Sequence, residues 1–204
     1  SILDASYFDR IDLGEYDVLV LPGGWGYRSF LDEARKERLK DWVASGGRLI
    51  AMGGALNHLG GDDGFSIKRI EAMAPDLELE EAPTYAQTSR DRIRNEITGA
   101  IFKTTVDATH PLAFGYGESY YTLKLGSDTF ELPGGGTVAA LGKSPEPVAG
   151  FAGNKAITKL PNSLVFAMEY YGRGQVVYMA DNPLFRGFWE NGKLFFANAL
   201  FMAE

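Results

Sequence analysis

Arg48-Leu49-Ile50-Ala51-Met52-Gly53-Gly54-Ala55-Leu56-Asn57-His58-Leu59 is the stretch that decides the fold. Its apolar run ends at two glycines, and apolar residues with helical spacing follow, so the pattern predicts a strand, a sharp turn and a helix. In α/β sheets such a turn lies at the carboxyl edge of the strands, where ligands and nucleophiles sit, because glycine tolerates strained backbone and lets other groups come close. Gly53 itself occupies the place of a catalytic side chain.

The residues before this turn predict a strand and a helix. Residues 17–21 form a continuous apolar run that ends at Pro22-Gly23-Gly24, as expected for a buried strand of a parallel sheet. Residues 32–45 have helical periodicity, with acidic residues first, and Gly46-Gly47 stop them. A strand, a helix and a second strand in this order predict a right-handed parallel crossover.

The second half of the chain predicts short strands joined by turns. The clearest hairpin joins residues 163–171 to residues 175–180 through Gly172-Arg173-Gly174, and an amphipathic helix is expected to close the chain. Further short strands are expected at residues 101–106, 120–125, 137–141 and 148–151. In the middle third we expect a short helix at residues 67–73, an edge strand at residues 77–80, and a solvated helix or loop at residues 90–96.

Length and composition limit the possible classes of protein. The 204 residues, 45% of them apolar, suit a single domain over residues 1–204. A net charge of −7 without any basic run interleaved with aromatics argues against nucleic acid as a partner, and no apolar run is long enough for a membrane span. The absence of cysteine excludes disulfides, thiolate metal sites and a cysteine nucleophile. The start at Ser1 suggests a fragment of a longer chain.

Two stretches carry a first resemblance to a known family. Residues 16–24, ending in Pro22-Gly23-Gly24, and the elbow at Gly53 resemble the start of the class I glutamine amidotransferase fold. In that family the first loop contributes oxyanion-hole backbone and the elbow carries a cysteine nucleophile, whereas this chain has Gly53. The family's later His-Pro-Glu matches Asn182-Pro183-Leu184 here. Because nucleophile, base and orienting acid are all replaced, the resemblance implies a degenerate site without thioester acyl transfer.

A second resemblance covers nearly the whole chain. Residues 41–51, 109–112 and 172–187 look like the amidotransferase-like domain that follows the catalytic domain in bacterial zinc carboxypeptidases of the carboxypeptidase A superfamily. The resemblance implies an exported parent protein, a fragment lacking the family's first strand and helix, and a catalytic domain in cis as partner. Zinc is expected only in that domain, because neither His58 nor His110 is followed by a glutamate three residues on. No cofactor and no metal site are expected in this chain.

The expected fold is therefore a flavodoxin-like three-layer α/β sandwich with a mainly parallel central sheet, of class I glutamine amidotransferase-like type, with extra antiparallel strands in the second half. A more distant relative is the trehalose-utilisation type, which keeps a carbohydrate ligand possible. Fold kinship by itself does not transmit function.

Several residues are candidates for ligand binding. Backbone amides of the paired glycines could form an anion-binding nest, or these glycines are only turn residues of the fold. The aromatic and guanidinium groups after the first strand and near the last helix could stack on a sugar or clamp a peptide carboxylate, or pack in the core or on a partner domain. Asp181 could bind a ligand or cap a helix, and His110 could act as a base or be structural. The candidates are Gly23, Gly24, Trp25, Arg28, Gly54, Asn57, His110, Asp181 and Arg186.

The sequence favours a catalytically inactive accessory domain that binds a peptide or carbohydrate ligand or serves as a scaffold. The alternative is a hydrolase or carbohydrate-processing domain of the trehalose-utilisation type, with a site such as Asp181, His110 and Asn57, which must then lie within hydrogen-bond reach of one another. A third hypothesis is a dimerisation module with an exposed apolar patch. The sequence does not determine the oligomeric state.

Overall fold

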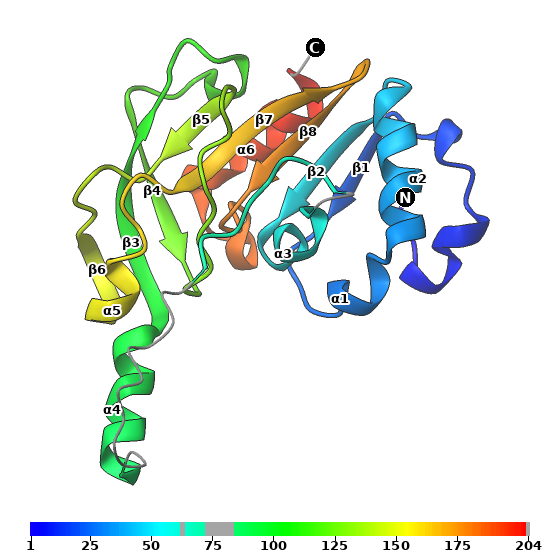
Figure 1. Ribbon diagram of the computed structural model, residues 1–204. Helices are drawn as coiled ribbons and strands as arrows, with labels where there is room; N and C mark the ends of the chain where they lie inside the picture. Colours follow the sequence, from blue (N-terminus) through cyan, green and yellow to red (C-terminus); the bar gives the residue numbers. More distant parts are fainter. Residues whose placement is uncertain (62–63, 72–83, 203–204) are drawn as a thin grey trace.

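A single mixed sheet of eight strands organises the chain (Figure 1). The computed structural model describes residues 1–61, 64–71 and 84–202. The strands are β1 (Val18–Leu21), β2 (Arg48–Met52), β3 (Ile97–Val106), β4 (Ser119–Lys124), β5 (Thr137–Ala140), β6 (Pro147–Ala152), β7 (Leu164–Tyr171) and β8 (Gly174–Met179). The helices are α1 (Tyr27–Phe30), α2 (Glu33–Ala44), α3 (Leu56–Leu59), α4 (Tyr85–Asn95), α5 (Asn154–Ile157) and α6 (Glu190–Phe201).

The order of the strands is β1-β2-β8-β7-β5-β3-β4, and β6 pairs with β3. Among the described strands, the β1–β2 and β2–β8 pairs are parallel and the other pairs are antiparallel. The prediction of a mainly parallel sheet was therefore wrong, whereas the extra antiparallel strands of the second half are confirmed. Parallel neighbours need a long crossover, which α2 supplies between β1 and β2, while a tight turn such as the one between β7 and β8 makes neighbours antiparallel.

The elements around the elbow agree with the sequence pattern. Asp32 caps α2 by accepting a hydrogen bond from the backbone N–H of Arg35 at 2.9 Å, and β2 pairs in parallel with β1 from Arg48 onward. The β7–β8 hairpin turns at Gly172, whose φ of 62° favours glycine. A 3-10 turn, Gly53–Ala55, connects β2 to α3, so the predicted strand, sharp turn and helix are confirmed.

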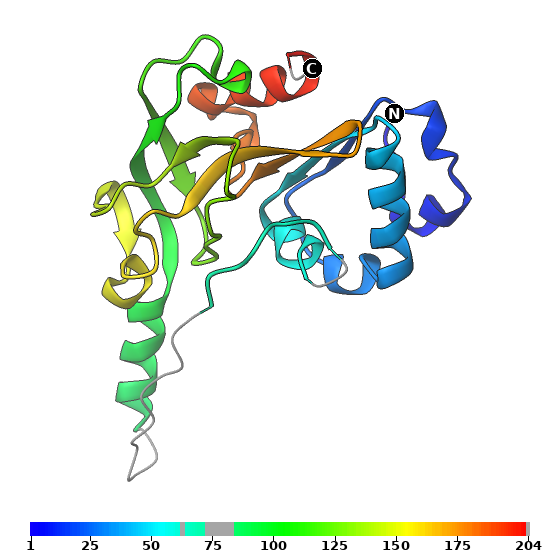
Figure 2. The same cartoon turned by 45° about the horizontal axis from the view of Figure 1, so that its top comes forward.

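Alternate side chains of the central strands enter two separate hydrophobic cores. Ile50 of β2 and Val177 of β8 face the core that contains Phe195 of α6. Leu49 and its neighbours on β8 face the other core, which contains Leu39, Trp42 and Val43 of α2. Period-two alternation thus places α2 and α6 on opposite faces of the parallel strands, as Figure 2 shows. A three-layer arrangement over the whole sheet stays a prediction.

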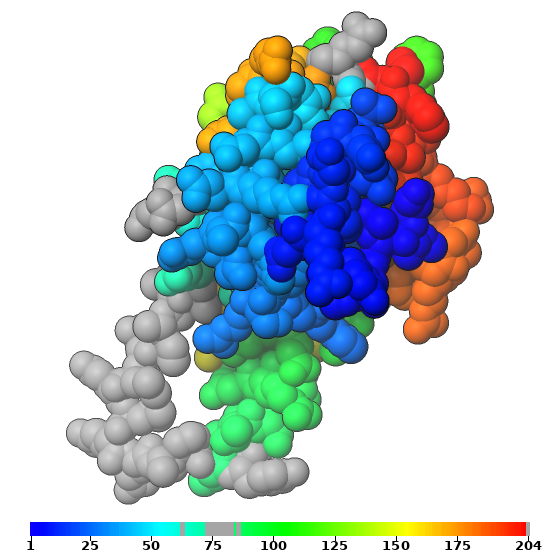
Figure 3. All heavy atoms as spheres, turned by 90° about the vertical axis from the view of Figure 1, so that its right-hand side faces the viewer, coloured from blue at the N-terminus to red at the C-terminus, as the bar shows by residue number. Residues whose placement is uncertain are grey.

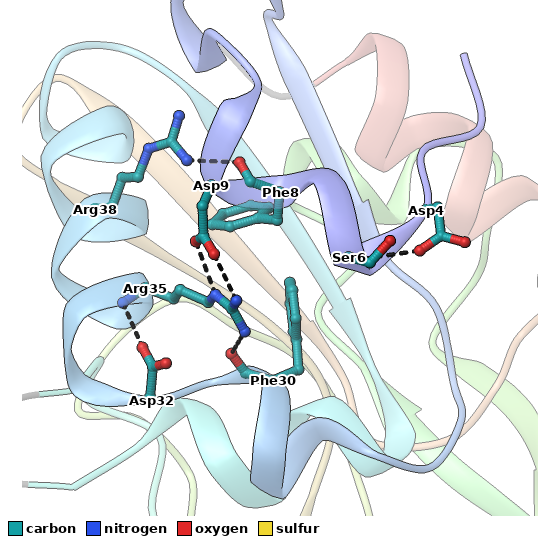
Figure 4. A network of polar contacts seen from close by, with 8 residues as sticks. All are labelled: Asp4, Ser6, Phe8, Asp9, Phe30, Asp32, Arg35 and Arg38. Carbon is teal, nitrogen blue, oxygen red and sulfur yellow. Dashed lines mark hydrogen bonds and ion pairs between the residues drawn. The ribbon is translucent and has the colours of Figure 1, made fainter.

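A helical N-terminal segment, Ala5–Arg10, lies against α2 rather than in the sheet (Figures 3 and 4). The Arg35 guanidinium donates to both carboxylate oxygens of Asp9, at 2.9 and 2.6 Å, and to the carbonyl of Phe30 at 3.1 Å. The ring of Phe8 packs edge-on against that of Phe30, with 5.2 Å between centroids. These contacts fix the segment beside the loop that follows β1.

The middle third differs from the expectation. Ile67 to Glu71 are not helical; the backbone N–H of Ile70 instead donates to the carbonyl of Thr129 at 2.8 Å, and that of Glu131 to the carbonyl of Lys68 at 2.9 Å. The predicted helix over residues 67–73 was wrong for its described part, because this backbone pairs with a distant segment. The predicted strand at residues 77–80 lies outside the described residues. Residues 90–95 belong to α4, which projects beyond the sheet (Figure 2).

Candidate functional site

A cavity of about 670 Å³ lies beside the elbow at the carboxyl edge of the sheet. Following the strand pairings across the sheet shows that β4 runs in the same direction as β1, β2 and β8, so the ends of these strands meet at one edge. Ligand pockets in proteins commonly have volumes of 300–1,000 Å³. The residues that line the cavity are Gly23, Gly24, Trp25, Gly26, Tyr27, Arg28, Gly53, Gly54, Asn57, His58, Leu123, Lys124, Leu125, Gly126, Asp128, Ala180, Asp181, Asn182 and Phe185.

The glycine pairs Gly23-Gly24 and Gly53-Gly54 line the cavity in the segments that lead from β1 to α1 and from β2 to α3. Gly53 has a φ of 49°, the left-handed conformation expected at a strained strand-to-helix turn. A Cβ on Gly54 would stand 2.3 Å from the carbonyl oxygen of Gly24, so the backbones of the two loops touch. The absence of a side chain at Gly54 therefore allows the loops after β1 and β2 to close together.

A buried ion pair forms one wall of the cavity. Asp181, two residues past β8, accepts a hydrogen bond from Thr122 Oγ1 at 2.8 Å and one from Lys124 Nζ at 3.2 Å. The side chains of Lys124 and Asp181 are only 2% and 7% exposed. The capping role considered for Asp181 is wrong, because its carboxylate is engaged by β4. The neighbouring Asn182 instead makes the local turn, accepting from the backbone N–H of Leu184 at 2.9 Å.

A second polar wall comes from α3. Asn57 Nδ2 donates to Asp128 Oδ2 at 2.8 Å, and the same carboxylate binds Arg69. Asn57 Oδ1 is buried and accepts no hydrogen bond from the described residues. A buried acceptor without a partner carries a desolvation cost, which a ligand donor can relieve. Burial, and then the positive charge of Arg28, lower the pKa of the adjacent His58.

Aromatic and cationic side chains stand at the mouth of the cavity. The side chain of Trp25 is fully exposed, at 102% of its reference area, and Arg28 is also exposed. Tyr27 Oη donates to the carbonyl oxygen of Pro22 at 2.7 Å, and partial burial raises its pKa. This hydrogen bond holds the loop after β1 in place beside Trp25.

Two of the predicted candidates lie elsewhere. His110 follows β3, which runs opposite to β8, so it lies at the other edge of the sheet; its Nδ1 accepts from the backbone N–H of Leu112 at 3.1 Å. The hypothetical site of Asp181, His110 and Asn57 is therefore not assembled. Arg186 does not line the cavity, and its guanidinium lies over the ring of Phe185 at 5.1 Å.

The positions that the resemblance matches to the amidotransferase triad are partly brought together. Gly53 and Asn182 both line the cavity, and a Cβ on Gly23 would lie 3.9 Å from Asn182 Nδ2. Leu184 packs at the border of the core that contains α6. The two loops that carry Gly53 and Asn182 thus meet, as the resemblance implied, with side chains that supply neither nucleophile nor base.

Sequence reasoning missed Lys124, Asp128 and Phe185, which also line the cavity. Lys124 ends a strand whose direction cannot be read from its own residues, and Asp128 lies in an irregular loop. The only signal was a charged residue within the apolar alternation of residues 120–125.

Neither a metal centre nor a membrane span emerges from the part of the chain that the structure describes. No three His, Asp or Glu side chains there gather closely enough to hold a metal ion. No helix there has the length and the apolar character needed to cross a bilayer.

No family model and no curated protein matches this chain. Among solved structures, a β-galactosidase from Bacillus circulans sp. alkalophilus matches 93% of this chain with 17% identity and a TM-score of 0.51. The cytoplasmic protein STM3548 from Salmonella typhimurium matches 94% of this chain and 74% of its own, with 17% identity and a TM-score of 0.49. A ThuA-like protein from Bacteroides uniformis matches 92% of this chain and 69% of its own, with 11% identity and a TM-score of 0.49.

This chain spans only 23% of the length of the β-galactosidase. At such identities the likeness shows a shared fold and nothing about activity. The mixed α/β sheet is thus a fold that a larger glycosidase also contains.

Proposed function

We propose that this chain is a carbohydrate-binding domain whose ligand occupies the cavity above the elbow, without acyl-transfer chemistry. The observation that carries the proposal is the combination of a fully exposed Trp25 at the mouth with the buried polar wall of Lys124 and Asp181. A sugar has apolar ring faces that pack on an aromatic ring and hydroxyl groups that donate and accept hydrogen bonds. The cavity offers a matching partner for each.

The polar groups favour a ligand that both donates and accepts. Asn57 Oδ1 is a buried acceptor that takes no hydrogen bond from the described residues, and the carboxylate of Asp181 can accept further hydrogen bonds. Lys124 has three ammonium donors and one hydrogen bond to Asp181. A hydroxylated ligand satisfies such a mixed set better than an apolar one, because every buried polar group needs a partner.

The elbow supports a role in binding rather than in acyl transfer. Gly53 stands at the strained turn where a nucleophile would be attached, and the whole sequence contains no cysteine. Asn182 replaces the base. The association with an exported zinc carboxypeptidase stays a prediction from the sequence, and we base the proposal on the cavity alone.

Binding of a panel of monosaccharides and disaccharides, measured by isothermal titration calorimetry, tests this proposal. We expect at least one sugar to bind, and Trp25→Ala to weaken its affinity roughly tenfold through loss of ring stacking. Phe201→Ala is the matched control, because Phe201 is 81% exposed at the far end of α6 and does not line the cavity. Absence of binding by every sugar, or equal losses in both variants, would refute the proposal.

A further inference from the structure

The charges along the cavity are not balanced. Of the two acidic residues in its lining, Asp181 is paired with Lys124 and Asp128 with Arg69. Arg28 also lines the cavity, and it makes no hydrogen bond or ion pair with any described residue. The lining therefore carries one guanidinium that no carboxylate of the described residues pairs with.

The surroundings of Arg28 reinforce this positive charge. His58 lies on the neighbouring wall, and Arg28, Arg69 and Lys36 all act to lower its pKa, against the single opposing charge of Asp128. The field on this side of the cavity is thus positive and favours an anion. Asp128 is paired with Arg69 and Asp181 with Lys124, and neither carboxylate forms an ion pair with Arg28.

Trp25 and Arg28 lie in the same short segment after β1, three residues apart, and both line the cavity. A ligand in this cavity therefore meets both an indole ring and a guanidinium group. Guanidinium groups bind carboxylates and phosphates through two parallel hydrogen bonds.

We propose that the ligand is an acidic sugar, in which Trp25 receives the ring and Arg28 binds a carboxylate or phosphate substituent. This inference rests on the carbohydrate-binding function proposed above and specifies its ligand class. The buried wall of Lys124 and Asp181 carries no net charge and faces the hydroxyl groups of the ligand, while the anion stays at the exposed side of the cavity.

Matched sets of sugars test the inference by calorimetry: glucose, galactose and mannose, each compared with its hexuronate and its hexose 6-phosphate. We expect an acidic member to bind about two- to fivefold more tightly than its neutral parent, as for an exposed ion pair. This advantage should shrink as salt is raised, because the charge at Arg28 is exposed and screened. Whether the hexuronate or the phosphate binds more tightly identifies the anion.

Arg28→Gln should lower the affinity for the acidic member more than that for the neutral parent, and so remove the preference. Arg173→Gln is the matched control, since Arg173 lies in the β7–β8 turn at the opposite edge of the sheet. Equal binding of neutral and acidic members, or a preference that survives Arg28→Gln, overturns this inference and leaves the proposed function standing. Failure of every sugar to bind overturns both.

Discussion

Gly54 is the residue at which the loops after β1 and β2 come into contact. Its φ is not in the left-handed region, so the need for glycine here comes from space and not from backbone conformation. A Cβ would stand 2.3 Å from the carbonyl oxygen of Gly24, far inside normal contact distance. Gly24 itself has nothing within 4 Å of its own hypothetical Cβ. There is therefore space for a side chain at Gly24 but not at Gly54.

We expect Gly54→Ala to lower the free energy of unfolding by about 1–3 kcal/mol, because the added methyl group must push the two backbones apart. Gly24→Ala, the matched control, should change it by less than about 0.5 kcal/mol, as for other surface substitutions. Urea denaturation of both variants measures the difference. Equal effects of the two substitutions would show that the loops do not touch.

At the scale of elements, the 3-10 turn Pro111–Ala113 after β3 depends on a neutral histidine. His110 precedes this turn, and its Nδ1 accepts a hydrogen bond from the backbone N–H of Leu112 at 3.1 Å. Partial burial lowers the pKa of His110, against a smaller opposing effect of Asp107. Protonation would convert the acceptor into a donor and break the contact.

Stability should therefore fall as the pH is lowered below about 6.5, the ordinary pKa of histidine. Because the pKa of His110 is lower in the folded state, the unfolded chain binds more protons in this window, and the free energy of unfolding decreases with decreasing pH. His110→Asn keeps an acceptor at the start of the turn and should reduce this decrease.

Thermal unfolding of the unsubstituted protein and of His110→Asn between pH 7 and pH 5 measures this pH dependence of stability. His58 contributes to the same decrease, since its pKa is lowered as well, so His58→Asn should remove the other part. An unchanged pH dependence in His110→Asn would contradict the role given to Nδ1.

At the scale of the whole molecule, the Lys124–Asp181 pair joins the two halves of the sheet. In strand order β4 and β8 are separated by β7, β5 and β3. They approach each other because β5 pairs with β3 through only Thr105 and Val106, and the sheet bends there, so that β3 and β4 stand steeply against β7 and β8 (Figures 1 and 2). The ring of Tyr120 on β4 also packs on Phe166 of β7, with 5.4 Å between centroids.

Removing one partner of this pair should destabilise the protein strongly. We expect Lys124→Met and Asp181→Leu each to lower the free energy of unfolding by about 3–5 kcal/mol, because the remaining charge is left buried and unpaired. The double variant should lose much less free energy of unfolding than the two single variants lose together, since no buried charge then remains. A double-mutant cycle by urea denaturation measures this coupling.

The exposed pair Lys193–Glu190, with side chains 41% and 78% exposed, is the control, and its coupling should be below about 1 kcal/mol. Additive effects of Lys124→Met and Asp181→Leu would show that the bend does not bring the two strands into energetic contact.

The sequence by itself determined the local elements of this protein. Apolar runs ended by glycine pairs predicted β1, β2 and the elbow at Gly53, because strand periodicity and the conformational freedom of glycine are properties of a few adjacent residues. The same local patterns predicted the β7–β8 hairpin and the helix that closes the chain. The predicted crevice between the side chains after β1 and those near the last helix is only half formed, because Trp25 and Arg28 line the cavity whereas Arg186 does not.

Only the tertiary structure decided which distant residues share the cavity. Whether a strand pairs in parallel depends on partners far away in the sequence, so the sequence pattern predicted neither the true extent of the antiparallel half nor the edge at which His110 lies. Asp181 meets Lys124, a residue 57 positions earlier, because the sheet bends at β5. The charge left on Arg28 follows from those same pairings, since the lining carboxylates were already bound to Lys124 and Arg69. Local periodicity carries no information on such long-range contacts, and the packing of the whole sheet creates them.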